Sequence, residues 1–337
     1  MDSVEKNSLS VLIIGCGNIA GGYDQGRPIG GWPYSHAGAY LRDGRFNLLG
    51  CIDPDEKKRI QFMSDWSIDV GFDSIDEVIR RQMYFDVISI CSPTHCHASD
   101  LRTALLLNPK LVFCEKPVTT AVNLTEDFVS QYNKAQVHLM VNHNRRWDPE
   151  IIKFRNQIYE GRWGELRAVN AIYNKGILNN GVHMIDLLQF LIGPMKVFAV
   201  GKGIVDFYHQ DPTIPVWLSG PQDLPVYLAC GHAADYAIFE IQFIFAGGVI
   251  TMEDGGQYWR KRMSSPGEVI KGYRVLDGGV LIAGGDDQSM SLAVDNIYRT
   301  VIHHDHLASC GETALQAQKM CEDIRYLSGL YERKIKS

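Results

Sequence analysis

A glycine-rich segment near the N-terminus has the residue types that bind a dinucleotide. The segment Gly15-Cys16-Gly17-Asn18-Ile19-Ala20 follows an apolar run at residues 11–14. A GxGxxG/A pattern after a strand forms a tight turn whose main-chain N–H groups can approach a pyrophosphate. The alternative is an ordinary strand-to-helix turn. We predict cofactor contacts at Gly15, Gly17, Asn18 and Ile19.

Asp53 ends a second apolar run, residues 48–52, where an acidic side chain binds the adenosine ribose hydroxyls in this motif. It lies 33 residues beyond Ala20, whereas about 20 are usual. A carboxylate here disfavours a 2′-phosphate. We therefore expect NAD rather than NADP as the cofactor, although the basic residues at 57–59 would favour NADP.

Residues 21–34 account for the extra length. This stretch of 14 residues is rich in Gly and Pro, and removing it leaves 19 residues between the motif and the acid. We interpret it as an insertion and expect the helix to begin near Ser35-His36-Ala37. Two interpretations of the insertion are open: a plain surface loop, or a segment that acts as a lid or contacts the substrate.

Two more polar segments follow apolar runs, at 92–97 (SPTHCH) and at 115–117 (EKP). Ligands of doubly wound folds bind outside the carboxyl ends of the strands. We predict cofactor contacts at Ser92, Pro93, Thr94, His97, Glu115 and Lys116. The nearby cysteines and histidines lack the spacing of a paired C-x2-C zinc site, so no metal is expected.

The elements that position these residues are strands alternating with helices. Short apolar runs at 11–14, 48–52, 87–91, 111–114 and 137–141 predict a doubly wound parallel α/β sheet. Asp148-Pro149-Glu150 opens a helix that closes before Gly161. Beyond it the odd positions of 237–245 are apolar, which predicts an α+β domain with a large, mainly antiparallel sheet. Further strands are expected at 197–200, 226–229, 249–252 and 280–283, and helices at 182–192 and 312–330.

Composition limits the function classes. A chain of 337 residues suggests two domains at roughly 150 residues each. The net charge of −6 offers no basic footprint for nucleic acid. No apolar run approaches the roughly 18 residues of a membrane span, and Met1–Lys6 look like a short acidic tail rather than a secretory signal. With eight cysteines and no such signal, a reducing cytoplasm is expected.

The motifs taken together resemble one family of oxidoreductases. The glycine segment, SPTHCH, EKP, NHNRRW at 142–147 and GVHMID at 181–186 occur in the order typical of the glucose-fructose oxidoreductase and inositol dehydrogenase (Gfo/Idh/MocA) family. The resemblance implies a Rossmann domain at 1–147, a substrate-binding α+β domain at 148–311, and a C-terminal helix at 312–337 that packs back on the Rossmann domain. Its open sheet implies a homodimer or homotetramer.

The activity implied by this resemblance is hydride transfer between a nicotinamide and a secondary hydroxyl or ketone of a sugar, cyclitol or nucleotide sugar. That chemistry needs a base and a donor to the developing oxyanion. His183 suits the base and Lys116 the donor, while Glu115 would hold a ribose hydroxyl or orient the lysine. Asp186, three residues after His183 on one helix face, would tune the base or bind substrate. A core histidine and a solvated lysine are the plainer alternatives.

Asn179 is a departure from the polyol-oxidising members of the family. They carry an Asp four residues before the histidine, whereas members that oxidise UDP-linked aminosugar uronates resemble this chain in having Asn. We therefore expect Asn179 to position a sugar nucleotide or modified hexose. Arg145 and Arg146 would bind a carboxylate or phosphate, or form an interdomain ion pair. The histidines at 303–306 suggest a surface cluster or a pocket lining.

Two other functions are open at this stage. One is a redox-assisted lyase or glycosidase in which the nicotinamide is reduced only transiently. The other is a non-catalytic nucleotide-binding regulator that keeps the fold without the chemistry.

Overall fold

The computed structural model describes residues 8–27 and 31–329. The tail expected at 1–6 lies outside this range. The described chain divides into two compact units, one of residues up to 147 together with 287–315, the other of residues 148–286 together with 316 onward. Each unit is described by itself.

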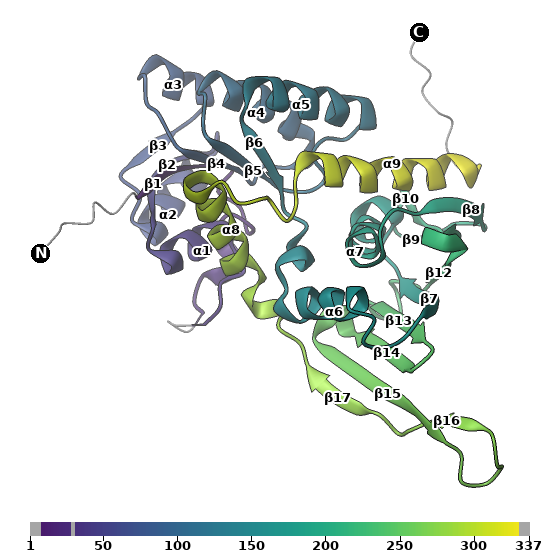
Figure 1. The fold of residues 1–337 in the computed structure, drawn as a ribbon. Helices are drawn as coiled ribbons and strands as arrows, with labels where there is room; N and C mark the ends of the chain where they lie inside the picture. The colour runs from purple at the N-terminus through teal and green to yellow at the C-terminus, as the bar shows by residue number, and fades with distance from the viewer. Residues whose placement is uncertain (1–7, 28–30, 330–337) are drawn as a thin grey trace, which may run out of the picture. The chain divides into compact units, whose positions relative to one another are not determined.

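The first unit is built on a six-stranded parallel sheet, which confirms the doubly wound α/β prediction (Figure 1). Its strand order is β3-β2-β1-β4-β5-β6. The strands are β1 (Leu9–Ile14), β2 (Phe46–Ile52), β3 (Val70–Phe72), β4 (Val87–Ile90), β5 (Leu111–Cys114) and β6 (His138–Val141). The helices are α1 (His36–Asp43), α2 (Glu56–Trp66), α3 (Ile75–Arg80), α4 (Thr94–Leu106), α5 (Val122–Ala135) and α8 (Ser289–His303).

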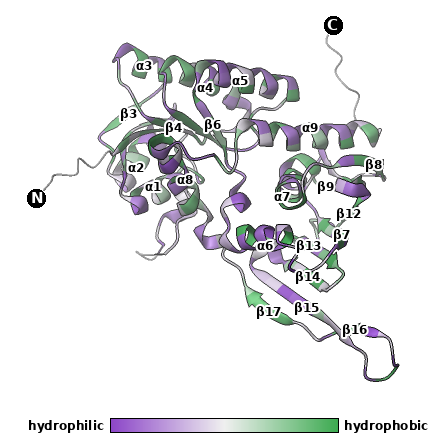
Figure 2. Ribbon diagram, in the orientation of Figure 1, coloured by the Kyte–Doolittle hydropathy of each residue, from purple (hydrophilic) through white to green (hydrophobic). Residues whose placement is uncertain are grey.

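Strand β1 is apolar apart from Ser10 because both faces of the sheet are covered. Val11 and Ile13 pack in one buried cluster, and Leu12 and Ile14 pack in the other, as the period of two requires. In Figure 2 the strands of this sheet are mostly hydrophobic, whereas the surrounding helices alternate in hydropathy. The order reverses between β1 and β4, so the carboxyl ends of these two strands border the crevice where such folds bind ligands.

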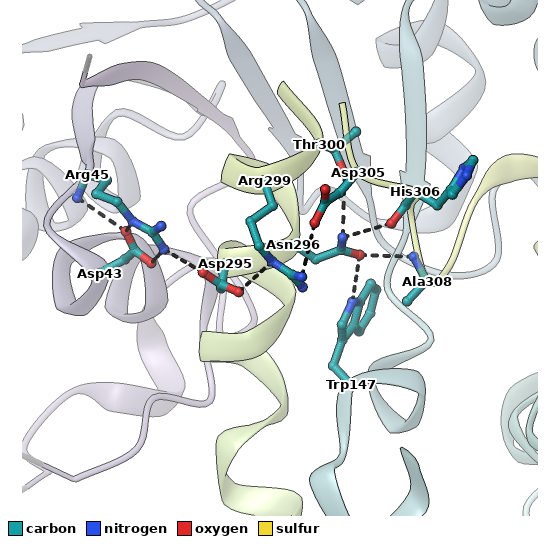
Figure 3. Close-up of polar contacts among 10 residues, drawn as sticks. All are labelled: Asp43, Arg45, Trp147, Asp295, Asn296, Arg299, Thr300, Asp305, His306 and Ala308. Atoms are coloured by element: carbon teal, nitrogen blue, oxygen red, sulfur yellow. Dashed lines mark hydrogen bonds and ion pairs between the residues drawn. The ribbon is translucent and has the colours of Figure 1, made fainter. Parts of the chain in front are cut away.

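Helix α8 belongs to the first unit, which corrects the domain boundaries expected from the sequence. Met290, Ala293, Val294 and Ile297 are buried in the core that contains β1. Figure 3 shows the polar contacts of this helix: Asn296 accepts hydrogen bonds from Trp147 Nε1 and the Ala308 amide, at 3.1 and 2.9 Å. The helix that returns to the Rossmann sheet is therefore α8, within the 148–311 segment assigned to the second domain.

The C-terminal helix α9 (Gly311–Leu327) was expected to pack on the Rossmann domain, but most of it packs in the second unit. Only its first residues, with Ala314, pack in the first unit. Ala317, Met320, Cys321 and Ile324 are buried in the core of the second unit. The expected boundary after Trp147 does coincide with a boundary between the units.

The second unit contains a nine-stranded sheet, mostly antiparallel with one parallel pair, β7 and β12. Its strands are β7 (Leu166–Tyr173), β8 (Lys196–Val200), β11 (Val216–Ser219), β12 (Pro225–Cys230), β13 (Phe239–Phe245), β14 (Gly248–Glu253), β15 (Tyr258–Pro266), β16 (Arg274–Leu276) and β17 (Val280–Ala283). A separate hairpin joins β9 (Ile204–Tyr208) to β10 (Asp211–Thr213), and the helices are α6 (Pro149–Tyr159), α7 (Val182–Ile192) and most of α9.

One face of this sheet is covered and the other is exposed. The alternation predicted for 237–245 is observed in β13, whose odd positions from 239 to 245 are buried. Phe154 of α6 packs on Phe243, with ring centroids 4.9 Å apart. The opposite face carries exposed aromatic side chains, among them Phe198 and Trp217. In the described part of the chain, no helix is long and apolar enough to cross a membrane; the cytoplasmic location stays a prediction.

Candidate functional site

The glycine loop follows β1 and is closely packed on one side only. Gly15 has φ 89°, and a Cβ atom there would lie 2.7 Å from the main-chain nitrogen of Ser92. Only glycine lets the loop approach the turn after β4 this closely. A Cβ at Gly17 would meet nothing within 4 Å. The loop therefore presents its main chain to open space, as a pyrophosphate site requires.

Helix α1 begins where the insertion hypothesis places it. Ser35 is its N-cap and accepts a hydrogen bond from the Gly38 amide. The His36 amide donates to the Ile19 carbonyl at 3.1 Å, and the Ala37 amide to the Ala20 carbonyl at 2.8 Å. These bonds continue the turn of the glycine motif directly into the helix. The insertion thus interrupts the first turn of α1 without displacing it.

Asp24, near the start of the insertion, binds the residues at its end. Its carboxylate accepts hydrogen bonds from the Tyr34 amide at 2.9 Å and from the amide and hydroxyl of Ser35 at 2.9 and 2.5 Å. Residues 28–30 of the insertion lie outside the described part of the chain.

Asp53 lies at the end of β2, next to the glycine loop. Its Oδ2 accepts a hydrogen bond from the Cys16 amide at 2.9 Å, and its Oδ1 accepts one from the Asp55 amide at 2.9 Å. The side chain is half-buried. The carboxylate that was predicted to bind ribose hydroxyls therefore also fixes the conformation of the glycine loop.

The turn after β4 contains Ser92, Pro93 and Thr94, and α4 begins at Thr94. Ser92 donates its hydroxyl hydrogen bond to Asp100 at 2.5 Å, and burial raises the pKa of that carboxyl. His97 is fully buried, with Nδ1 2.9 Å from the Pro117 carbonyl and Nε2 2.8 Å from the Ser92 carbonyl. His97 thus ties the Ser92 turn to the Pro117 loop, and its place inside the unit fits positioning rather than direct cofactor contact.

Glu115 is the centre of a buried polar network after β5. Its Oε1 accepts hydrogen bonds from Asn142 Nδ2 at 2.6 Å and from His36 Nε2 at 3.0 Å. Burial raises the pKa of Glu115, but the hydrogen bonds from His36 and Asn142 and the charge of Lys116 outweigh it, so the pKa lies below its ordinary value. The carboxylate stays ionised beside Lys116, with 14% of its side chain exposed.

His36 is a residue of this network that sequence reasoning missed. It is fully buried, and its Nδ1 lies 3.3 Å from the hydroxyl of Ser89, which also bonds the Tyr40 hydroxyl at 2.8 Å. The signal was a histidine in the first turn of α1, directly after the interrupted glycine motif. Because its partner Glu115 is 79 positions away, only the fold brings the two together.

Asn179 and His183 lie in the second unit. Asn179 is on a π-turn at Ile177–Gly181, and His183 is in α7, which follows this turn directly. Such turns occur often at functional sites. The side-chain amide of Asn179 donates to the Lys175 carbonyl at 3.1 Å. His183 is half-buried in the first turn of α7, whereas Asp186, one turn later, is only 2% exposed. The burial of Asp186 fits tuning of the histidine better than contact with substrate.

The two neighbouring arginines differ in their surroundings. Arg146 is 6% exposed and donates from Nη1 to the Ala308 carbonyl at 3.0 Å. One N–H group of its guanidinium thus bonds inside the first unit, and the anion contact predicted for Arg146 stays a prediction. Arg145 is half-buried and stays a candidate for anion binding.

Histidines and cysteines form no metal centre within residues 8–27 and 31–329, where no group of three His, Cys, Asp or Glu is arranged to hold an ion. All eight cysteines are free thiols. Of the histidines at 303–306, His303 ends α8 and packs edge-on against Tyr298. The carbonyl of His306 accepts a hydrogen bond from Asn296 at 3.0 Å.

The strand order, the glycine loop and Asp53 define the first unit as a Rossmann-type nucleotide-binding domain. A family model described as an oxidoreductase family with an NAD-binding Rossmann fold, GFO_IDH_MocA, matches residues 9–143. The resemblance stated from the motifs is thereby confirmed over residues 9–143, which are less than half of the chain.

A curated protein is similar to part of this chain. An inositol 2-dehydrogenase of Rhizobium meliloti (strain 1021) is 31% identical over 146 residues, which are 39% of this chain and 44% of that protein. The alignment thus spans less than half of the relative.

Two solved structures share the fold over nearly their whole length. An oxidoreductase from Agrobacterium radiobacter in complex with NAD+, L-tartaric acid and magnesium has a TM-score of 0.77 at 15% identity, covering 96% of both chains. The UDP-N-acetylglucosamine 3-dehydrogenase GnnA from Acidithiobacillus ferrooxidans has a TM-score of 0.73 at 14% identity, covering 95% of this chain and 97% of that one.

Proposed function

We propose that the protein is an NAD-dependent oxidoreductase that transfers a hydride between the nicotinamide and a secondary hydroxyl or ketone of a sugar derivative. The observation that carries the proposal is the set of groups at the carboxyl edge of the parallel sheet: an open glycine loop held by Asp53, next to an ionised, hydrogen-bonded Glu115 that is followed by Lys116. Such a set suits a dinucleotide on one side and a reacting oxygen on the other.

The residues present fit a dinucleotide. The main chain at Gly15, Gly17, Asn18 and Ile19 would hold the pyrophosphate, and Asp53 the adenosine ribose. Ser92, Pro93 and Thr94 would line the next part of the site, with His97 supporting their turn from inside. Glu115 has carboxylate surface left for a ribose hydroxyl. The cofactor, when bound, supplies the hydride acceptor or donor.

The reacting oxygen needs a donor and a base. Lys116 would stabilise alkoxide character on the substrate oxygen through its ammonium group, and Glu115 would keep that lysine charged. His183 would take or return the hydroxyl proton. Lys116 and His183 belong to different units, so their joint action on one substrate is part of the proposal.

The substrate class follows from Asn179 and Arg145. An amide in place of a carboxylate orients a hydroxyl without serving as a base, which favours a nucleotide sugar or modified hexose over inositol. The nucleotide-sugar dehydrogenase of the same fold supports this choice. Arg145 would bind a phosphate or carboxylate of such a substrate through two parallel hydrogen bonds.

The test is a panel of sugars and nucleotide sugars assayed with NAD and with NADP through nicotinamide absorbance. Turnover of a nucleotide sugar or hexose derivative with NAD is expected. Activity with NADP alone would contradict the role given to Asp53. Product formation without net nicotinamide reduction would indicate the redox-assisted lyase instead. Tight NADH binding without turnover of any sugar would indicate a regulator.

We also propose that the protein forms a homodimer or homotetramer through the exposed face of the nine-stranded sheet. Phe198 and Trp217 pack together there with ring centroids 5.4 Å apart, and Tyr227 lies opposite Trp217 on the next strand. Exposed aromatic side chains at the centre of a patch are typical of protein interfaces. Sedimentation of the Trp217→Glu variant should give the monomer mass, whereas an unchanged mass would place the interface elsewhere.

A further inference from the structure

The segment that carries Asn179 and His183 is held by the small β9–β10 hairpin. Gly176 begins the π-turn, and the amides of Asn180 and Gly181 donate to its carbonyl at 3.1 and 2.9 Å. α7 follows at Val182 without a break. Any displacement of Gly176 is therefore passed through the turn to the start of α7, where His183 lies.

Asp211 of β10 binds the beginning of this turn with both carboxylate oxygens. Oδ1 accepts from the Leu178 amide at 2.9 Å, and Oδ2 accepts from the Asn179 amide at 2.8 Å. The carboxylate is 8% exposed. The first N–H groups of a helical turn have no acceptor within it, so Asp211 satisfies two buried donors at once.

Gly176 fits against Asp211 so closely that no other residue could replace it without moving the carboxylate. A Cβ atom there would lie 2.2 Å from Asp211 Oδ2, and the residue has φ 87°. The contact thus depends on two residues: Gly176, which has no side chain, and Asp211, whose carboxylate lies against the turn.

The amides of Lys175 and Gly176, just before the turn, are bound by the same hairpin. Thr213 Oγ1 accepts from the Gly176 amide at 2.8 Å and donates to Asp206 Oδ1 at 2.7 Å. Asp206 Oδ2 accepts from the Lys175 amide at 2.9 Å. Side chains from the hairpin therefore bind the amides of four residues between 175 and 179.

We propose that Asp211 is a positioning residue for the reaction, because it fixes the π-turn and so sets where Asn179 and His183 are presented. This inference rests on the function proposed above. It assigns the β9–β10 hairpin a role in turnover rather than in folding alone. Asp211 itself touches neither substrate nor cofactor in this assignment.

The experiment compares Asp211→Ala and Asp211→Asn with a matched control, Asp223→Asn, whose carboxylate is exposed in the same unit and does not contact the turn. Deuterium exchange of peptides covering 175–183 is measured with no substrate present. The NADH dissociation constant, kcat and KM are measured on the variants with the substrate found by the panel, and melting temperatures verify that they are folded.

For Asp211→Ala we expect faster exchange in 175–183 and a fall in kcat of about 10- to 100-fold, as misplacement of a reacting group by about 1 Å produces. NADH affinity should stay within about twofold of the wild type, since the contact lies in the second unit. Asp211→Asn keeps one acceptor oxygen and should recover part of the loss. The control should match the wild type in every measurement.

Wild-type kcat per folded molecule in Asp211→Ala, with only a lower melting temperature, would show a merely structural role and overturn the inference. Unchanged exchange in 175–183 would overturn it as well. Should the wild-type protein turn over no substrate, the proposed function fails, while the exchange result still decides whether Asp211 holds the turn. Gly176→Ala, whose Cβ would meet both the carboxylate and the main-chain oxygen of Asp211, should also speed exchange in 175–183 and lower kcat.

Discussion

At the residue scale, His183 is the group on which the proposed proton transfer depends. Replacing it by alanine removes the base and leaves the glycine loop, Asp53 and Glu115 unchanged in the other unit. We expect kcat to fall by about 10²-fold or more, the usual worth of a positioned general base. NADH binding, measured by fluorescence titration, should be unaffected.

The control for this prediction is an exposed histidine outside the site, His232, replaced by alanine. Turnover of His183→Ala at the wild-type level would remove the histidine from the mechanism. A loss of NADH affinity equal to the loss of turnover would instead indicate that the substitution disturbs the fold.

Glu115 gives a prediction for pH dependence. Its pKa in the folded protein lies below the ordinary value of 4.5, so ionised Glu115 contributes stability that is fully present above that value. The contribution is lost as the pH falls through the lower, folded-state pKa. The free energy of unfolding, measured by urea titration from neutral to acidic pH, should therefore decline in this window.

Glu115→Gln should show a smaller decline over the same pH range, because the amide does not titrate. The variant should also be less stable than the wild type at neutral pH, since His36 and Asn142 lose an anionic acceptor. An identical pH dependence in the two proteins would contradict the role given to this carboxylate.

At the element scale, α8 makes buried and exposed polar contacts that differ in their contribution to stability (Figure 3). Asn296→Ala removes the acceptor of Trp147 Nε1 and of the Ala308 amide, leaving buried donors unpaired. It should cost about 2–4 kcal/mol in the free energy of unfolding. Arg299 is 47% exposed and bonds Asp295 and Asp305; Arg299→Ala should cost about 1 kcal/mol or less.

Denaturant unfolding of both variants decides this prediction. Equal losses of stability would contradict the larger contribution assigned to the buried contacts of Asn296.

Five of the six strands of the Rossmann sheet were predictable because buried parallel strands are mostly apolar, as in β1 and β5, whereas the three-residue strand β3 was not predicted. The start of α1 was predictable from the length of the insertion. Helix α8 was not predicted, although Met290, Ala293, Val294 and Ile297 have the spacing of an apolar helix face. The β9–β10 hairpin was not predicted: β10 has only three residues, Pro212 among them, although the sequence IVDFY of β9 is typical of a strand.

In the candidate site, too, some residues could be identified from the sequence and others could not. Gly15, Asp53 and Glu115 were identifiable because their residue types follow strands whose carboxyl ends share one edge. His36, Asn142 and Asp211 were not, because each acts on a partner brought close only by the fold; Asp211 lies 32 residues from the amide of Asn179. The charge of Arg146 left anion binding and an interdomain ion pair open, and its burial could not be read from the sequence.

At the scale of the whole molecule, the net charge of −6 means that a dinucleotide is not attracted by overall charge. Its affinity must come from the local groups of the first unit, which has its own core. NADH at 100 times its dissociation constant should therefore stabilise that unit by about 2.7 kcal/mol. Deuterium exchange should slow around the glycine loop and not in the nine-stranded sheet.

Gly17 provides a control for the stabilisation by NADH. A Cβ atom there would meet nothing within 4 Å, and the residue does not have a positive φ. Gly17→Asp should fold with the melting temperature of the wild type, yet place a carboxylate where the pyrophosphate is proposed to lie. NADH should then no longer raise its melting temperature. If NADH stabilises Gly17→Asp as much as the wild type, the dinucleotide binds elsewhere and the glycine loop is only a turn.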